Sequence, residues 1–477
     1  MSTTAPPAPE TSPTADGALA APPTPTLREA FAYWLRLGFL SFGGPAGQIA
    51  LMHEDLVVRK RWISERRYLH ALNYCMVLPG PEAQQLATYI GWLMHRSWGG
   101  ILAGSLFVLP SLLILIALSW VCMAWGQVPA VAGVLYGIKP AVTAIVVSAA
   151  VRIGSRALKN RWLWAIAAAA FVAAVGPGLP FPLIVLVAGL IGGLGGRFAP
   201  AHFKAGGGHG GAGAGHGPAV IDDDTPTPAH ARFTWAGFTR VLLASLALWA
   251  LAYGALLAWQ GPAGAAGAPE AAGTLAHMAR FFTQAALLTF GGAYAVLPYV
   301  YQGAVEHFHW LSAAQMMDGL ALGETTPGPL IMVVAYVGFV GAWTKAVFGP
   351  DALALAGIAG ACVVTFFTFL PSFCFILLGG PFIESTHGNL KFTAPLTGIT
   401  AAVVGVILSL AVFFAGHVLW PHGPGSTPAQ WLTGLDAPAA AIGAAAALAL
   451  FRFKRSVIEV VLGAAAAGWA WQLIAAH

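Results

Sequence analysis

The residues with the clearest chemical potential in this chain lie beside two Pro-Gly-Pro tripeptides, at 79–81 and 327–329, within strongly apolar sequence. Glu82 directly follows the first tripeptide, and Glu324 lies three residues before the second. Ionisable side chains are costly inside a membrane and commonly belong to ion or proton pathways. The two carboxylates are therefore candidate coupling groups that carry a proton, with helix capping as their alternative role.

Each tripeptide also interrupts an apolar run, as do the Gly-Gly pairs at 43–44 and 291–292. Backbone polar groups freed by such breaks survive in a membrane only where they line an enclosed cavity. A helix that resumes after a break presents free N–H groups and a partial positive charge, and these bind anions. Four helix starts meeting inside the membrane would hold an oxyanion without a large buried counter-charge.

The predicted substrate site consists of the break residues and the small polar side chains beside them. It comprises Ser41, Gly43, Gly44, Pro79, Gly80, Pro81, Gln84, Thr289, Gly291, Gly292, Pro327, Gly328 and Pro329. Arg36, five residues before Ser41, is the candidate cation for an anionic substrate, and its alternative role is to extend toward the membrane surface. A single break indicates only a kink or close helix packing, whereas the duplicated set favours a binding site.

The breaks belong to an internal duplication. Ser-Phe-Gly-Gly at 41–44 matches Thr-Phe-Gly-Gly at 289–292, and this offset of 248 residues also relates the two Pro-Gly-Pro tripeptides. Duplicated halves with matched breaks are typical of secondary transporters, whose sites lie between the repeats. Further matched pairs are Trp62 with Trp310, Ser64 with Ser312, Leu-Pro-Ser at 109–111 with Leu-Pro-Ser at 370–372, and the helix-kinking Pro140 with Pro395.

The composition is that of a polytopic membrane protein. Of the 477 residues, 58% are hydrophobic and only 9% are charged, whereas a soluble domain carries about 25% charged residues. The net charge of +5 does not indicate nucleic-acid binding, because Lys and Arg cluster at the ends of apolar runs. The four cysteines lack CxxC spacing and no P-loop sequence occurs, so neither a metal, a cofactor nor ATP hydrolysis is expected.

Four parts can be distinguished along the chain. Residues 1–26 are predicted to be a disordered Pro- and Ala-rich tail, and 27–196 the first transporter repeat. A flexible Gly- and His-rich cytoplasmic linker is expected over 197–232. An extra membrane helix and the second repeat occupy 233–477. We therefore expect an all-α polytopic membrane protein with about 13 membrane segments, some of them broken or re-entrant.

Loop charges predict that the two repeats have opposite orientations in the membrane. Loop 53–67 carries five Lys or Arg residues and its counterpart 301–315 carries none, while loop 152–161 carries four and 416–436 none. Positive residues prefer the cytoplasmic side. Three apolar segments separate the two basic loops, so both are cytoplasmic only if 68–95 enters the membrane and returns. The alternative is that every segment spans.

The motifs together resemble those of the chromate ion transporter (CHR) family. The resembling sequences are RLGFLSFGGP at 36–45, LPGPEAQQL at 78–86, FVLPS at 107–111, LTFGG at 288–292 and ETTPGP at 324–329. The resemblance covers roughly residues 28–475 and fits the long-chain, two-domain form. It implies an inner-membrane protein that exports chromate and confers chromate resistance, with homologous halves of opposite topology.

Three other functions stay open from the residues alone. Sulfate, another tetrahedral dianion, has the same shape and charge and would fit the same helix-end site. A passive anion channel would carry the same motifs, because alternating access leaves none. A membrane oxidoreductase is disfavoured by the absence of cofactor motifs and paired cysteines. The expected partners are an oxyanion and the lipid bilayer, and self-association is left open.

The loop charges generate a topological prediction. In intact cells, a membrane-impermeant maleimide should label a single cysteine placed in loop 301–315 but not one placed in loop 53–67. The background for both variants lacks the natural Cys75, Cys122, Cys362 and Cys374. Permeabilised cells serve as the control, because both loops should then react. Equal labelling of the two loops from outside would contradict opposite orientations.

Overall fold

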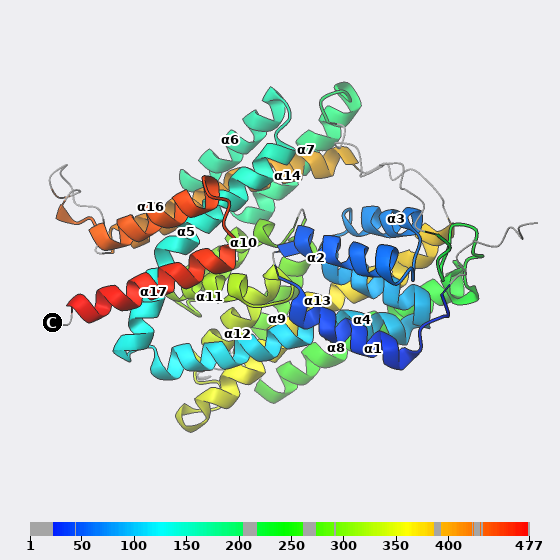
Figure 1. Cartoon of the computed structure of the whole chain (residues 1–477), viewed down its shortest axis with the longest axis horizontal. Coiled ribbons are helices and arrows are strands. Elements are labelled where there is room, and N and C mark those ends of the chain that lie inside the picture. Colours follow the sequence, from blue (N-terminus) through cyan, green and yellow to red (C-terminus); the bar gives the residue numbers. More distant parts are fainter. Residues whose placement is uncertain are drawn as a thin grey trace, which may run out of the picture.

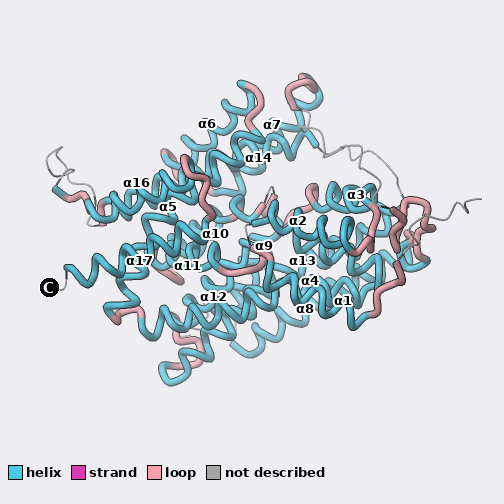
Figure 2. Tube along the Cα trace, in the orientation of Figure 1, coloured by secondary structure: helices cyan, strands magenta, loops and turns pink. Residues whose placement is uncertain are grey.

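The computed structural model describes residues 22–42, 44–203, 217–260, 273–290, 292–385, 393–421, 423, 430 and 433–475. Within these residues the chain is built from helices and has no β-strand longer than one isolated bridge (Figure 1, Figure 2). Seven of the helices are long and apolar enough to cross a membrane, and three shorter helices are also apolar. The expectation of an all-α, multi-pass membrane protein is confirmed.

The first repeat begins with short helices, and its two longest helices, α4 and α5, follow them. Its elements are α1 (Leu27–Leu40), α2 (Gly44–His53), the π-helix η1 (Glu54–Arg59), α3 (Glu65–Cys75), α4 (Glu82–Trp125), α5 (Pro129–Ala157), α6 (Arg161–Val175) and α7 (Phe181–Phe198). The apolar segment 68–95 is divided by its Pro-Gly-Pro turn into α3 and the first part of α4. A non-helical kink at His95 and Arg96 ends this segment, and α4 continues beyond the kink to Trp125.

The second repeat follows the same order after one additional helix, α8 (Trp235–Gln260), which has no counterpart in the first repeat. Its elements are α9 (Thr274–Leu288), η3 (Ala293–Ala295), α10 (Leu297–Tyr301), the π-helix η4 (Gln302–His307), α11 (Ala313–Thr325), η5 (Leu330–Met332), α12 (Val333–Thr344), η6 (Pro350–Ala352), α13 (Leu353–Ser385), α14 (Thr393–Leu419), α16 (Ala437–Phe451) and α17 (Val457–Ala475). The short 3-10 helix η2 (Ala229–Ala231) lies before α8.

Matching elements of the two repeats begin at matching positions. The π-helices η1 and η4, and the helices α3 and α11, start at residues separated by the same offset of 248 as the sequence motifs. The recurring serines explain the second match, because each hydroxyl caps the helix that follows it. Ser64 Oγ accepts a hydrogen bond from the N–H of Arg67 at 3.3 Å, and Ser312 Oγ accepts one from Gln315 at 3.2 Å.

The recurring tryptophans follow the two π-helices. The N–H of Trp62 donates to the carbonyl of Leu56 at 2.7 Å, and the N–H of Trp310 donates to Ala304 at 2.8 Å. Both indole side chains are buried. The landmarks shared by the repeats therefore include the residues that end one helix and start the next.

The two repeats exchange helices. α5 packs against α16 and α17 of the second repeat, and its counterpart α14 packs against α6 and α7 of the first. α5 and α14 also pack against each other. Figure 1 shows these helices together, with α6, α7 and α14 in the upper part of the view and α5, α16 and α17 at the left. Because each contact has a reciprocal counterpart, the repeats are related by a pseudo-twofold axis.

Two of these helix crossings depend on glycine pairs. Gly137 of α5 faces Gly468 of α17, and a Cβ added to Gly137 would lie 2.8 Å from the Gly468 Cα. The matching crossing of α7 and α14 pairs Gly192 with Gly398, where a Cβ added to Gly192 would lie 3.1 Å from the Gly398 Cα. Small residues allow membrane helices to approach this closely.

The ends of the predicted tail and linker pack against the first repeat. Thr26, the last residue of the predicted tail, caps α1 in a capping box with Glu29. Residues 217–232, which we call the strap, belong to the predicted flexible linker. In the strap, Ile221 pairs with the backbone of loop 53–67 and Ala231 is buried. Residues 1–21 and 204–216 lie outside the described part of the chain.

The glycine crossing predicts a large effect of Gly468→Ile. A side chain at this position meets backbone atoms of Gly133 and Gly137 within 2.4 Å. Gly463→Ile, on the same helix, is the matched control because a Cβ there meets nothing within 4 Å. Overpacking costs about 1–3 kcal/mol or more, so only Gly468→Ile should lower the thermal midpoint of the purified protein. Equal midpoints of the two variants would argue against the crossing.

Candidate functional site

The chain breaks of one repeat are joined to those of the other by backbone hydrogen bonds. The N–H of Gly80, in the first Pro-Gly-Pro turn, donates to the carbonyl of Thr289 at 2.7 Å. The N–H of Gly328, in the second turn, donates to the carbonyl of Ser41 at 2.8 Å. The two bonds are reciprocal, because Gly80 corresponds to Gly328 and Ser41 to Thr289. They join the four breaks in two pairs, each made of one break from either repeat.

Ser41 and Thr289 suit this role because each ends a helix and carries a hydroxyl. The Ser41 hydroxyl donates to the carbonyl of Leu37, one turn earlier in α1, at 2.7 Å. The Thr289 hydroxyl donates to the carbonyl of Ala285 in α9 at 2.6 Å. Helix ends carry carbonyls without an intrahelical partner. Each hydroxyl satisfies one of them, and the residue's own carbonyl accepts from the glycine of the other repeat.

Only glycine fits at the centre of the two turns. Gly80 has φ +123° and Gly328 has φ +105°, a region that side chains disfavour. A Cβ added to Gly80 would lie 2.5 Å from the Ser372 Oγ, and one added to Gly328 would lie 2.7 Å from the Ser111 Cβ. These serines end the two Leu-Pro-Ser sequences. Kinked helix α13 therefore packs on the turn of the first repeat, and α4 packs on the turn of the second.

A small cavity lies where the four breaks meet. It is lined by Pro45, Gln48, Pro81, Glu82, Ala83, Gly292, Ala293, Pro329 and Leu330. Every break contributes residues at the start of the helical segment that follows it. The accessible volume is about 10 Å³, which is room for roughly one water molecule. The structure therefore shows this place in a closed form that is too small for an oxyanion.

Buried polar atoms without a hydrogen-bond partner gather around the breaks. Among the described residues they include Gln48 Oε1, Gln84 Oε1, Gln85 Oε1, Ser111 Oγ and Ser372 Oγ. An unpaired buried polar atom costs about 1–3 kcal/mol, and such atoms in a native structure call for a bound water or ligand. The cluster therefore marks a place where a polar ligand would be stabilised.

The sequence prediction does not include Gln48, Ser111 or Ser372. Gln48 Nε2 donates to the carbonyl of Gly328 at 2.5 Å and that of Ser41 at 3.2 Å. Gln48 carries no repeat signal, because Val296 occupies the equivalent position. Ser111 and Ser372 belong to the recurring Leu-Pro-Ser sequence. The effect of proline on helix shape is enough to explain this recurrence, so it does not indicate a role for the serine hydroxyls.

The two candidate carboxylates have different surroundings. Glu82 is half-buried at the first residue of α4 and lines the cavity. Glu324, near the end of α11, does not line it, and its carboxylate accepts a hydrogen bond from the Tyr294 hydroxyl. Glu82 is therefore the carboxylate that a bound ligand could meet directly.

The structure does not bring Arg36 to the breaks. Its side chain is exposed on the outer surface of α1, which agrees with the alternative role of extending toward the membrane surface. Gln84 is fully buried in α4, where its amide donates to Thr88 Oγ1 at 3.0 Å. Gly43 and Gly291 lie outside the described part of the chain.

The remaining predicted residues lie in the turns themselves. Gly44 and Gly292 have φ +73° and +101°, and a Cβ added to either meets nothing within 4 Å. Pro81 and Pro329 precede the first residues of α4 and η5 and line the cavity. The other turn prolines, Pro79 and Pro327, flank the two central glycines and do not line the cavity.

Comparison with known proteins shows extensive similarity. The chain matches the chromate transporter family over residues 28–193 and 276–469, one region in each repeat. It is 30% identical to the chromate transport protein of Cupriavidus metallidurans over 95% of this chain and 96% of that protein. Identity to the chromate transport protein of Pseudomonas aeruginosa is 32%, over 94% of each chain. No solved structure matches the chain.

Proposed function

Because the chain belongs to the chromate transporter family, we propose that it exports chromate from the cytoplasm across the inner membrane and so confers chromate resistance. The observation that supports this most directly is the meeting of four chain breaks, two from each repeat, around one cavity. Sites at the interface of duplicated halves are typical of secondary transporters. The protein is accordingly a transporter and not an enzyme.

In this proposal neutral donors hold the oxyanion. α2 and α4 begin at the cavity and present backbone N–H groups that have no carbonyl partner within the helix. The buried hydroxyls of Ser111 and Ser372 lie against the two Pro-Gly-Pro turns and add one donor from each repeat. Chromate carries two negative charges and accepts such bonds from several directions. Because no cation lines the cavity, a bound dianion can also be released.

Transport requires the closed cavity to open toward each side in turn. The Gly80–Thr289 and Gly328–Ser41 hydrogen bonds join the repeats at the cavity. Bonds at a pivot move little when two bodies rock against each other. We therefore assign the paired breaks both the substrate site and the pivot about which the repeats move.

Uptake by everted membrane vesicles tests the substrate and the serines together. Vesicles containing the protein should accumulate chromate, and excess unlabelled chromate should compete better than sulfate. Ser111→Ala and Ser372→Ala should each raise the half-saturating chromate concentration roughly tenfold, because a hydrogen bond to a charged group contributes about 1.5–3 kcal/mol.

Ser119→Ala is the matched control for the serine variants. Ser119 is also a buried serine of α4 without a described hydrogen-bond partner, but it lies two turns beyond Ser111. Its replacement should leave the half-saturating concentration unchanged. An equal effect of all three replacements would place the anion elsewhere, and a stronger competition by sulfate would overturn chromate as the substrate.

A second prediction concerns energy coupling through Glu82. Replacement by Gln keeps the shape of the side chain and removes its ability to release a proton. An acid vesicle interior should accelerate chromate uptake by the parent protein, and Glu82→Gln should lose this acceleration while retaining uptake down a chromate gradient. Glu324→Gln should keep it, since Glu324 does not line the cavity. Acceleration that survives in Glu82→Gln would exclude Glu82 as the proton carrier.

A further inference from the structure

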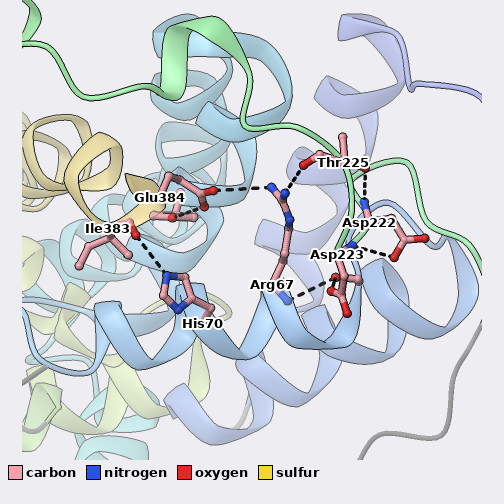
Figure 3. Close-up of polar contacts among 9 residues, drawn as sticks. Arg67, His70, Asp222, Asp223, Thr225, Ile383 and Glu384 are labelled. Carbon is pink, nitrogen blue, oxygen red and sulfur yellow. Dashed lines mark hydrogen bonds and ion pairs between the residues drawn. The ribbon is translucent and has the colours of Figure 1, made fainter. Parts of the chain in front are cut away.

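A buried charge cluster joins the two repeats beside the basic loop 53–67. Figure 3 shows Arg67 of α3 directed at Glu384, near the end of α13, with Arg67 Nη1 3.6 Å from Glu384 Oε2. The hydroxyl of Tyr89, in the first part of α4, donates to the other Glu384 oxygen at 2.6 Å. The side chains of Arg67 and Glu384 are only 14% and 6% exposed. The cluster thus connects α3 and α4 of the first repeat to α13 of the second.

The strap covers the same cluster from the opposite side. Arg67 also donates to the carbonyl of Thr225, so its guanidinium lies between Glu384 and the strap (Figure 3). The strap is itself fixed, because the Ser64 hydroxyl donates to Asp223 at 2.6 Å. His230 adds a contact at its other end, with Nε2 3.0 Å from the carbonyl of Trp92. The Arg67 side chain therefore links α3 to both α13 and the strap.

The equivalent helix of the second repeat carries a different charge pair. Asp318 Oδ1 of α11 lies 3.7 Å from Lys139 Nζ of α5, and the side chains of Asp318 and Lys139 are 8% and 28% exposed. Gln315, the counterpart of Arg67, instead contacts the sulfur of Met123 at 3.8 Å. Met123 occupies the position of Glu384, since each lies twelve residues beyond the serine of its Leu-Pro-Ser sequence. α11 thus contacts α4 as α3 contacts α13, but the charge pair of the second repeat joins α11 to α5.

Each pair ties the helix before a Pro-Gly-Pro turn to a helix of the other repeat. α3 leads into the first turn and is held to α13, and α11 leads into the second turn and is held to α5. If the repeats have opposite orientations, the two pairs belong to opposite sides of the cavity. Separated charges in a buried place are costly unless water reaches them. A pair is therefore expected to separate only when water enters the space between that pair and the cavity.

We propose that the two pairs are gates: Arg67–Glu384 closes the cytoplasmic path to the cavity, and Lys139–Asp318 closes the external path. This inference rests on the proposed transport function and on opposite orientations of the repeats. Both pairs are formed in the structure while the cavity has room for one water molecule. That combination is the one expected when both gates are closed. Transport then requires one pair to open while the other stays formed.

Cysteine accessibility tests the gates without any substrate. The reporter is Ala83→Cys, because Ala83 is buried and lines the cavity, in a background lacking the four natural cysteines. Its reaction with a charged methanethiosulfonate reagent is measured in everted vesicles and in right-side-out vesicles. Arg67→Gln should raise the reaction rate from the cytoplasmic face by at least roughly tenfold, as expected when a buried pair loses one partner. Lys139→Gln should raise the rate from the external face instead.

Three further variants separate gating from misfolding. Arg66→Gln removes the same charge at an exposed neighbour of Arg67 and should change neither rate. Tyr89→Phe removes one hydrogen bond but keeps the ring, and should raise the cytoplasmic rate by a smaller factor. The charge exchange Arg67→Glu with Glu384→Arg should return the rate toward that of the parent. Protein level and thermal midpoint are measured for every variant.

An unchanged cytoplasmic rate in folded Arg67→Gln, or an equal change in Arg66→Gln, would overturn the cytoplasmic gate. A faster external rate in Arg67→Gln would overturn its assignment to the cytoplasmic side. Since labelling needs no chromate, a response of the reporter without chromate uptake would reject the proposed substrate and leave the gates standing.

Discussion

A membrane protein cannot leave backbone polar groups unpaired in contact with lipid, and the rest of this structure depends on how the four chain breaks meet that constraint. The breaks of the two repeats satisfy each other's unpaired backbone groups. A glycine N–H of one repeat pairs with the carbonyl of a helix-ending Ser or Thr of the other. The exchange uses backbone groups alone, whereas the positive φ of Gly80 and the approach of Ser372 require a small residue there, and the Ser41 hydroxyl satisfies the carbonyl of Leu37. The exchange also keeps the start of the next helix free for a ligand.

The two repeats differ at residues to which we assign proton coupling and gating. The hydrogen-bond exchange, the helix crossings and the serines beside the turns are all reciprocal, and they build the scaffold and the proposed substrate site. Glu82, by contrast, corresponds to Leu330, and Arg67 corresponds to Gln315. Two identical halves in opposite orientations would make the two sides of the membrane equivalent. The unmatched residues are therefore what can make the two faces of the protein different.

Much of this arrangement could be predicted from the sequence, because Gly, Pro and recurring offsets report local backbone constraints. For this reason the sequence predicts the duplication, the all-α fold and the residues that join the breaks of the two repeats. The exposure of Arg36 could not be predicted, since the face that a helix buries depends on its tertiary neighbours. Gln48 lies at the breaks without a repeated signal. The kink within α4 at His95 and Arg96 could be predicted, because these polar residues end the apolar segment 68–95.

The strap shows that amino-acid composition alone can fail to predict which part of a linker is ordered. The Gly- and His-rich stretch before it predicts a flexible linker over 197–232, yet Ile221 and Ala231 are buried against the first repeat. Three buried apolar residues, Ala219, Ile221 and Ala231, are too few to alter the average composition of such a segment. They are sufficient to fix its path when backbone hydrogen bonds accompany them. Isolated apolar residues in polar linkers are therefore worth examining as anchors.

The exchange of helices between the repeats also has a consequence for biosynthesis. α17 is synthesised long after α5, yet the two helices pack against each other. The face of α5 that contains Gly137 remains without its partner helix until α17 is synthesised. The first half therefore cannot mature as an independent unit during translation, in contrast to the domain-by-domain order common in large proteins. Quality control of this protein must tolerate a half-assembled chain until α16 and α17 are made.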